Sequence, residues 1–420
     1  MLEKSTKPKK QTPRWLVIFC LVFAGEMIFS LPFHVPRFFR PTLLDVFNMS
    51  NAEFGDALAL YGVMAMLSYF PGGVIADRFS ARKLMTISLI ATALGGIFFA
   101  MIPGQAGLSV ICAFWGITTI FLFWAPMIKV TREWGGKLAQ GRAFGLLDGG
   151  RGLVAAGAAS LAVLVLVSWI TGDPENTSLL VRTRAIQSVI YYYSAVTLGT
   201  AILVWFFIPD TQENNTISQK SSLHGIKYVI RSRSVWLQAI IVVCAYCGYK
   251  GLDFYTLYVV KILGFNEVSA AQFMSNASYL RPVAAIGAGF LADRFTTKKI
   301  IAITFLLALG SYIILAWIRP EIRLLNIVYA NLAFTFMAVY ALRGVYFALL
   351  EETNIRGIYT GTAVGLVSVI GYTPDIFFYS AGGRIIDAAP GLTGFHHFYM
   401  FLGVFAIAGL LATLILVKKG

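Results

Sequence analysis

The chain has 420 residues, of which 58% are hydrophobic and 13% are charged, and its mean hydropathy is +0.73. Soluble domains average about 45–50% apolar and about 25% charged residues, so this composition excludes a disordered chain, a collagen and an ordinary cytosolic enzyme. The net charge of +14 could indicate a nucleic-acid partner, and the position of the charges decides that question.

Apolar runs of about 18 residues or more predict twelve membrane-spanning helices and therefore an all-α integral membrane protein. In the first half of the chain the runs cover 15–36, 58–76, 84–102, 108–130, 143–166 and 186–208. In the second half they cover 236–258, 270–292, 300–318, 325–350, 359–378 and 395–417. The first run is too long for the apolar region of a signal peptide and lacks a small-residue cleavage site, so we expect it to be retained as a helix.

Lysine and arginine are distributed unequally over the loops. With both termini placed in the cytoplasm, the cytoplasmic segments hold 21 Lys and Arg residues and the outer loops hold 8. Because positively charged loops stay inside, this distribution predicts a multi-pass protein of the cell (inner or plasma) membrane with both termini cytoplasmic. It also accounts for most of the positive charge without a nucleic acid, for which no compact basic domain is present.

The longest polar stretch, 209–235, divides the chain near its middle. We therefore expect an N-terminal six-helix bundle over 1–208, a cytoplasmic central loop over 209–235 and a C-terminal six-helix bundle over 236–420. The end of the loop, from Ser222 to Trp236, places apolar residues at helical spacing opposite a basic face. It can lie along the inner membrane surface or be a solvated linker, and the sequence favours neither.

A short motif occurs twice, at corresponding places in the two halves. Gly73-Val-Ile-Ala-Asp77-Arg78-Phe79 ends the second expected span, and Gly289-Phe-Leu-Ala-Asp293-Arg294-Phe295 ends the eighth. A basic pair follows each copy. Internal repeats of this kind are typical of secondary transporters.

The repeated motif resembles the loop signature G-x-x-x-D-R-x-G-R-[RK] of the major facilitator superfamily, although both copies lack the loop glycine. The resemblance extends over the whole chain and implies two pseudo-symmetric six-helix bundles with a substrate site between them near mid-membrane. It implies a secondary transporter that works by alternating access. It also implies that a cytoplasmic gate is formed by Asp77, Arg78, Asp293 and Arg294. The alternative is that these four residues are only the polar ends of helices.

Nine charged residues fall inside the expected spans. The bases are Lys129, Arg151, Lys250, Arg281 and Arg343, and the acids are Glu26, Asp148, Asp253 and Asp375. An unpaired charge at a helix centre costs about 2.5–3.5 kcal/mol on insertion scales, so these residues must be paired, hydrated or bound to a ligand. None lies on spans 3, 6, 9 or 12, which in the resembled family pack against lipid.

Arg281 and Arg343 are the strongest candidates for substrate binding, because a guanidinium binds a carboxylate or phosphate through two parallel hydrogen bonds. Lys250 and Arg151 would assist them. The alternative is that each arginine pairs with an acid on another helix, namely Glu26, Asp148 or Asp375. The spacing also allows pairs within one helix, Asp148 with Arg151 and Lys250 with Asp253. Glu351 lies two turns from Arg343.

Glu26, Asp148 and Asp253 are candidates for proton coupling, and Glu26 leads because a buried carboxylate can hold a proton near neutral pH. A salt bridge is its alternative role. His34 titrates in the same range, but it can equally be an interfacial residue. In span 11, Pro374 predicts a helix break, and Asp375 beside it can bind an ion or cap the break.

Several motifs are absent from the sequence. It contains no G-x-x-x-x-G-K-[ST] loop, no H-E-x-x-H, no G-x-S-x-G and no metal-ligand pattern, so neither an ATP-driven pump nor an enzyme is expected. Cys244 and Cys247 lie inside an apolar run and are interpreted as packing thiols. We expect no catalytic residue, cofactor or metal, and a monomer in the lipid bilayer with protons or a counter-substrate as second partner.

The excess of five bases over four acids favours a carrier of a small anionic metabolite, such as an organic acid or phosphorylated sugar, driven by proton symport or by antiport. The alternative is a proton-coupled carrier of an amino acid or neutral sugar, in which all nine charges would form internal pairs and one proton site. A receptor or scaffold would need larger soluble segments than these loops provide.

Overall fold

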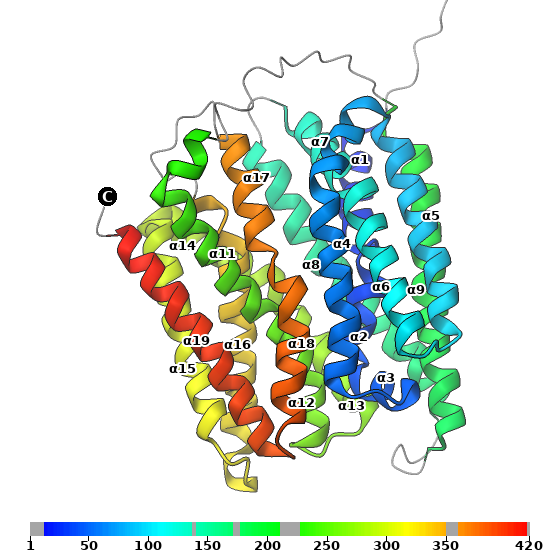
Figure 1. Ribbon diagram of the computed structural model, residues 1–420, viewed down its shortest axis with the longest axis vertical. Helices are drawn as coiled ribbons and strands as arrows, with labels where there is room; N and C mark the ends of the chain where they lie inside the picture. The colour runs from blue at the N-terminus through cyan, green and yellow to red at the C-terminus, as the bar shows by residue number, and fades with distance from the viewer. Residues whose placement is uncertain (1–11, 137–139, 171–176, 211–226, 350–359, 418–420) are drawn as a thin grey trace, which may run out of the picture.

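The computed structural model describes residues 12–136, 140–170, 177–210, 227–349 and 360–417. Within these ranges the chain forms helices joined by short connections, and no strand occurs in them (Figure 1). This is the all-helical membrane architecture that the apolar runs predict.

The elements before the polar midpoint are called the N-terminal helices. They are α1 (Arg14–Met27), the π-helix η1 (Ser30–His34), α2 (Val35–Phe38), α3 (Arg40–Phe47), α4 (Asn51–Arg78), α5 (Ala81–Ala100), α6 (Gln105–Thr119), the π-helix η2 (Ile120–Trp124), α7 (Ala125–Gly135), α8 (Gln140–Val167) and α9 (Leu179–Phe207).

The elements after the midpoint are called the C-terminal helices. They are α11 (Arg233–Gly251), the 3₁₀ turn η4 (Leu252–Phe254), α12 (Tyr255–Lys261), α13 (Glu267–Ser278), α14 (Leu280–Phe295), α15 (Thr297–Trp317), η5 (Ile322–Leu324), α16 (Leu325–Val345), α17 (Thr360–Gly371), α18 (Pro374–Asp387) and α19 (Leu392–Val417). Most of the predicted central loop lies outside the described residues, and residues 227–231, at its end, are helical.

Polar residues fix where two of the helices begin. Ser50 accepts a hydrogen bond from the backbone N–H of Glu53, and the Glu53 carboxylate accepts one from the backbone N–H of Ser50. This capping box satisfies backbone donors that would otherwise lack a partner in the first turn of α4. Asn266 caps α13 in a similar way by accepting from the N–H of Ser269.

Among the described residues, nine helices, counted across their small internal breaks, are long and apolar enough to cross a membrane, and two bent pairs bring the number to eleven. Arg14–Met27 meets Ser30–Phe38 at 44°, and Asn51–Tyr69 meets Pro71–Arg78 at 52°. The expected span over 270–292 consists of two helices in the structure, because α13 ends at Ser278 and α14 begins at Leu280. Pro282 has no N–H to donate to the Ser278 carbonyl, and the loss of this hydrogen bond favours a break at this point. The predicted count of twelve is therefore not confirmed.

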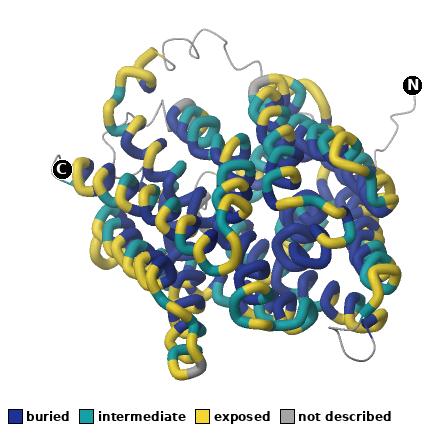
Figure 2. The backbone as a smooth tube through the Cα atoms, turned by 60° about the horizontal axis from the view of Figure 1, so that its bottom comes forward, coloured by how far each residue is buried: buried dark blue, intermediate teal, exposed yellow. Residues whose placement is uncertain are grey.

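The outer surface of the bundle is apolar. Figure 2 shows the buried residues between the helices and the exposed residues around the outside. Large side chains such as Phe290 and Trp317 are 72% and 74% exposed, respectively. Soluble monomers rarely expose apolar surface of this extent, whereas a lipid-facing surface consists of it.

The N-terminal helices lie on one side of the molecule and the C-terminal helices on the other (Figure 1). Between the two sets, α4 packs against α18, and α8 packs against α13 and α14. We call the end at which α4 begins and α18 ends the sealed end, formed by 51–56 and 380–387. The opposite end, at which α1 begins and α19 ends, is the terminal end.

Hydrogen bonds join the two sets of helices at the sealed end. The Asn51 amide donates to Asp387 at 2.9 Å, and the Arg384 guanidinium forms a bidentate pair with Asp56 at 2.7 and 2.8 Å. Thr42 donates to Glu267 at 2.6 Å. The sealed end is therefore held by polar contacts between helices that are distant in the sequence.

Glycines let α4 and α18 approach backbone to backbone. A Cβ atom on Gly62 would lie 2.3 Å from the carbonyl carbon of Asp375, and one on Gly55 would lie 2.4 Å from the carbonyl oxygen of Tyr379. Any larger side chain at these places would push the helices apart.

Candidate functional site

A cavity lies between the two sets of helices. Its empty space measures about 590 Å³, including the part that opens to solvent. Its lining is rich in charged and aromatic side chains from both sets: Glu26, Phe29, Phe33, His34, Arg37, Tyr61, Tyr69, Ile120, Trp124, Arg151, Tyr246, Tyr249, Lys250, Arg343, Tyr372 and Asp375.

A local change of helix type places several of these side chains on the cavity wall. After α1 the first span changes to the π-helix η1 and bends by 44° before continuing as α2. Phe33, His34 and Arg37 line the cavity from this segment. Pro32 and Pro36 remove backbone donors there, which favours departure from a regular α-helix. π-helical turns are frequent at functional sites.

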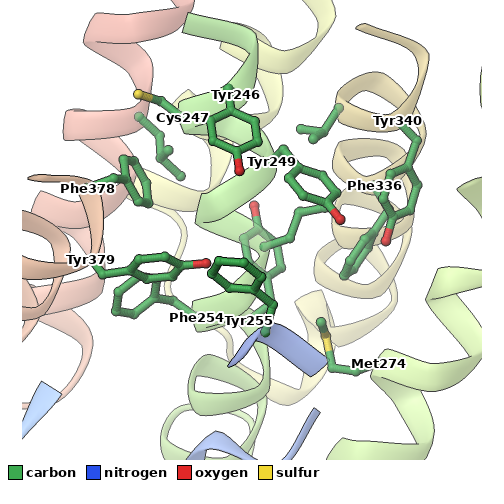
Figure 3. Packing of buried hydrophobic residues seen from close by; sticks show 14 of the residues in the cluster. Tyr246, Cys247, Tyr249, Phe254, Tyr255, Met274, Phe336, Tyr340, Phe378 and Tyr379 are labelled. Carbon is green, nitrogen blue, oxygen red and sulfur yellow. The ribbon is translucent and has the colours of Figure 1, made fainter. Parts of the chain in front are cut away.

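Aromatic rings form much of the wall on the C-terminal side. The rings of Tyr246 and Tyr249, one turn apart on α11, stack with centroids 6.0 Å apart (Figure 3). The Tyr246 ring meets that of Tyr372 edge to face at 4.9 Å, and Tyr372 stacks on Tyr69 of α4 at 6.5 Å. These contacts surround the charged groups with flat apolar faces and phenol hydroxyls.

Glu26, on α1, is the centre of an ion cluster. Its Oε2 accepts from Nε of Arg151 at 2.9 Å, and its Oε1 lies 3.3 Å from Nη1 of Arg281. His34 Nε2 lies 3.1 Å from the same Oε1. Arg281 also reaches Asp148 at 3.3 Å. The cluster joins the N-terminal helices to α14.

Arg37 and Asp253 form a second buried pair between the two sets. Arg37 Nε donates to Asp253, and its Nη1 donates to the Tyr249 hydroxyl at 2.8 Å. The Tyr379 hydroxyl donates to the other oxygen of Asp253. Asp253 therefore has protein partners on both oxygens and does not line the cavity.

Lys250 and Asp375 form a third pair, within the C-terminal helices. Lys250 Nζ lies 2.7 Å from Asp375 Oδ1, and the Tyr246 hydroxyl lies 3.1–3.2 Å from both carboxylate oxygens. The ammonium also lies 3.6 Å from the centroid of the Phe33 ring. The chain leaves helical geometry between Gly371 and Pro374, where the sequence predicts a break, and this places Asp375 on the wall.

Arg343 differs from the other bases of the lining. Among the described residues, no hydrogen-bond partner lies within reach of its buried Nε and Nη1 atoms. Its guanidinium carbon lies 4.0 Å from the centroid of the Tyr249 ring, a cation–π contact. Glu351, the acid nearest to it in the sequence, lies outside the described residues.

The sequence placed the charges on the right helices but predicted only part of their pairing. The possible pairs within a helix, Asp148 with Arg151 and Lys250 with Asp253, are wrong, because each member contacts a residue on another helix. Arg281 follows the ion-pair alternative and does not line the cavity. Lys129, on α7, is half-buried and does not line it either.

The four residues of the predicted gate lie at the terminal end. Asp77, Arg78, Asp293 and Arg294 are all exposed. Arg294 contacts the ring of the adjacent Phe295 at 5.6 Å. In the described part of the chain, none of the four is ion-paired to another helix, so the gate remains a prediction for another conformation.

The loop after Asp77 and Arg78 is instead anchored by a residue that the sequence analysis did not select. The Ser80 hydroxyl donates to Asp210, which also accepts from Arg82. These donors, with the Ser80 bond first, hold the pKa of the Asp210 carboxyl below its usual range. This links the start of α5 to the chain just beyond α9.

Arg37 and the aromatic wall are the parts of the site that were not selected as site residues from the sequence. The Pro-Arg pair at Pro36 and Arg37, just after an intramembrane histidine and a second proline, was the available signal. The tyrosines of α11 recur on one helix face, but aromatic residues in membrane helices are common as packing and interface residues.

Comparison with known proteins places this architecture among transporters. The sequence model of the Major Facilitator Superfamily matches residues 15–378. Inner membrane protein YihN of Escherichia coli (strain K12) is 27% identical over 97% of this chain and 96% of its own length. YqcE of the same organism is 28% identical over 92% of this chain and 91% of its own length.

Solved structures show the same fold. A bacterial homolog of the human lysosomal transporter Spinster, in an inward-facing and unoccupied conformation, aligns over 96% of each chain with a TM-score of 0.71 at 13% identity. The nucleoside transporter NupG aligns over 96% of this chain and 99% of its own with a TM-score of 0.71 at 12% identity.

Proposed function

Because the chain belongs to the Major Facilitator Superfamily of membrane transporters, we propose that it is a secondary active carrier of a small anionic metabolite, such as an organic acid or a phosphorylated sugar. The substrate would bind in the cavity between the N-terminal and C-terminal helices. Alternating access to that cavity would carry it across the membrane.

The observation that carries this proposal is the surplus cation in the site. The site contains five basic side chains, Arg37, Arg151, Lys250, Arg281 and Arg343, and four carboxylates, Glu26, Asp148, Asp253 and Asp375. All four carboxylates form ion pairs with the other four bases, and Arg343 forms no ion pair among the described residues. Buried guanidinium nitrogens without hydrogen-bond partners are costly, and an anion from the cavity would remove that cost.

The alternative, an amino acid or neutral sugar as substrate, is less consistent with this arrangement. It requires every buried charge to be neutralised within the protein, and Arg343 contradicts that requirement in the described part of the site. The aromatic rings beside Arg343 offer flat faces to the uncharged part of a substrate, while the guanidinium holds its acid group.

The contacts at the sealed end support alternating access. With the termini in the cytoplasm, as the Lys and Arg distribution indicates, this conformation would be closed to the outside. The names of YihN and YqcE support an inner-membrane location. Transport would be coupled to protons or to the exchange of a second substrate. Of the candidate proton-coupling acids Glu26, Asp148 and Asp253, only Asp148 is appreciably accessible, with 39% of its side chain exposed.

Thermal unfolding of the purified chain in nanodiscs tests the substrate class. Glucose, glucuronate and glucose 6-phosphate share a ring and differ in charge, and leucine serves as the zwitterion. We expect one or both anions to raise the unfolding temperature and the neutral and zwitterionic compounds to leave it unchanged. Since a hydrogen bond to a charged group contributes about 1.5–3 kcal/mol, Arg343→Gln should weaken anion binding by about tenfold to a hundredfold.

Arg184→Gln is the matched control, because it removes the same charge from an exposed position on α9. It should leave anion binding unchanged. Stabilisation by glucose or leucine alone, or anion binding that survives Arg343→Gln, would show that the assignment to an anionic substrate is wrong. Compounds that stabilise the protein are then tested for uptake into proteoliposomes with and without a pH gradient.

A further inference from the structure

His34 combines burial with access to the cavity. It is the last residue of the π-helix η1, it is only 2% exposed, and it lines the cavity. Its ring packs edge-on against the rings of Phe38 and Tyr193, each with centroids 5.8 Å away. These contacts fix the orientation of the imidazole.

The contacts of His34 determine which ring nitrogen carries hydrogen. Nε2 lies 3.1 Å from Oε1 of Glu26, whose negative charge is stabilised by Arg151 and Arg281. An ionised carboxylate only accepts hydrogen bonds, so Nε2 must be the N–H donor. The neutral ring then carries its lone pair on Nδ1, which is buried and has no hydrogen-bond partner in the described structure.

His34 and Arg281 share one carboxylate oxygen. Both contact Oε1 of Glu26, at 3.1 and 3.3 Å, whereas Arg151 contacts Oε2. Glu26 lies on α1 and Arg281 on α14, so the shared oxygen belongs to a link between the two sets of helices. Arg281 has a second acceptor, Asp148, at 3.3 Å on α8.

Charged and titratable groups face His34 from every element packed around it. They are Glu26 on α1, Arg37 on α2, Arg151 on α8, Tyr193 on α9 and Arg281 on α14. Glu26 favours a positive imidazole, and Arg37 and Arg281 oppose it. Withdrawal of Arg281 would therefore strengthen proton binding at His34, and by linkage proton binding would favour that withdrawal.

We propose that His34 is the proton-binding site of this transporter, with Nδ1 as the atom that accepts the proton. The imidazolium then makes a charge-assisted hydrogen bond to Oε1 of Glu26 and displaces Arg281 toward Asp148. Proton binding thereby weakens the link between α1 and α14. The role in coupling rests on the proposed transport function, whereas the protonation chemistry can be tested without any substrate.

Nitrogen NMR of the full chain, labelled with ¹⁵N-histidine in nanodiscs, tests the site directly. The chain has four histidines, and His34→Gln identifies the His34 signals by their loss. We expect the neutral Nε2–H form at about pH 8.5 and conversion to imidazolium before about pH 4.5. A neutral Nδ1–H form, or a ring that stays neutral over this range, would overturn the proposal.

Arg281→Gln tests the competition for Glu26. It should raise the pH at which half of His34 is protonated by about one unit, a tenfold gain in proton affinity, because a like charge is removed. Arg184→Gln, on the exposed side of α9, should leave the titration unchanged. An Arg281→Gln titration identical to that of the unmodified chain would contradict the coupling. Anion binding at Arg343 is measured separately, so either assignment can fail while the other stands.

Discussion

The Lys250–Asp375 pair shows how a charge is stabilised in the wall of the cavity. The ammonium has a carboxylate oxygen at 2.7 Å on one side and an aromatic ring centroid at 3.6 Å on another. Tyr246 adds a hydroxyl donor to Asp375. Lys250 and Asp375 therefore neutralise each other, and removal of either residue would leave the charge of the other without its main partner.

Removal of one partner should be more harmful than removal of both. Breaking a buried pair on one side costs about 3–5 kcal/mol, because an uncompensated charge remains. We expect Lys250→Met and Asp375→Asn each to lower the unfolding temperature in detergent clearly, and the double variant to regain much of the loss. Strictly additive losses in this double-mutant cycle would show that the two residues are not coupled.

At the residue scale the sequence predicted which side chains lie in the core of the protein but, apart from the acids named as alternatives for Arg281, not their partners. Spacing along one helix suggested neighbours three residues apart, whereas the partners are 125 residues apart for Arg151 and Glu26 and 216 for Arg37 and Asp253. Such partners depend on how whole helices pack, which spacing within one helix does not contain. Hydropathy likewise could not reveal the free lone pair of His34, because that depends on the position of Glu26.

The packing of α4 against α18 depends on residues without side chains. Gly55 and Gly62 on α4 meet the backbone of α18 at Tyr379 and Asp375. Gly383 on α18 meets the backbone at Asn51 in return. Because three such contacts lie along this pair of helices, the short distance between α4 and α18 depends on a glycine at each of the three positions.

Gly62→Ala should separate these helices. Its Cβ would meet the Asp375 backbone at 2.3 Å, and overpacking of this kind costs about 1–3 kcal/mol. We expect a longer distance, measured by pulsed EPR, between spin labels on cysteines at Asp45 and Thr393, both exposed at the sealed end.

Gly157→Ala on α8 is the control for this measurement, because nothing lies within 4 Å of the Cβ that it adds. It should leave the distance unchanged and stabilise α8 by up to about 1 kcal/mol through helix propensity. Equal distances in both variants would show that Gly62 does not set the spacing of α4 and α18.

At the element scale, composition predicted membrane helices but few of their breaks. A hydropathy window averages over the π-turn at Ser30–His34 and the 3₁₀ turn at Leu252–Phe254, because both consist mainly of apolar residues. The gap before Pro374 was expected because proline carries a local signal. Pro32 lies within the π-turn and gave a similar signal there, whereas the 3₁₀ turn contains no proline and has no clear mark in composition.

In the molecule as a whole, the two sets of helices are joined at the sealed end by hydrogen bonds and an ion pair. The Lys and Arg distribution predicts that this sealed end faces away from the cytoplasm. Exposed positions occur at both ends, Thr393 at the sealed end and Lys83 at the terminal end. The four native cysteines are buried, so their background reactivity should be low.

Labelling of intact bacterial cells by a membrane-impermeant maleimide tests this orientation. We expect Thr393→Cys to react in intact cells and Lys83→Cys to react only after lysis. The unsubstituted chain, with its buried thiols, is the control. The reverse pattern would mean that the charge distribution does not set the topology and that the sealed end faces the cytoplasm.

At this scale the sequence was most informative. The apolar runs and the duplicated motif at Gly73 and Gly289 together indicated the family and its fold, because both signals depend on local residues repeated along the chain. The number of spans could not be obtained in the same way, since bends at 44° and 52° and the division of α13 from α14 depend on packing.

The surplus cation at Arg343 has an electrical consequence. Without substrate the site, which comprises the charged residues of the cavity and their buried ion-pair partners, carries one positive charge more than its carboxylates neutralise, and a bound monovalent anion would bring the sum to zero. An elementary charge that crosses the full field is worth about 2.3 kcal/mol per 100 mV. The membrane potential would therefore act on the movement of the empty carrier and leave the loaded carrier nearly unaffected, so voltage would set how fast the empty site returns.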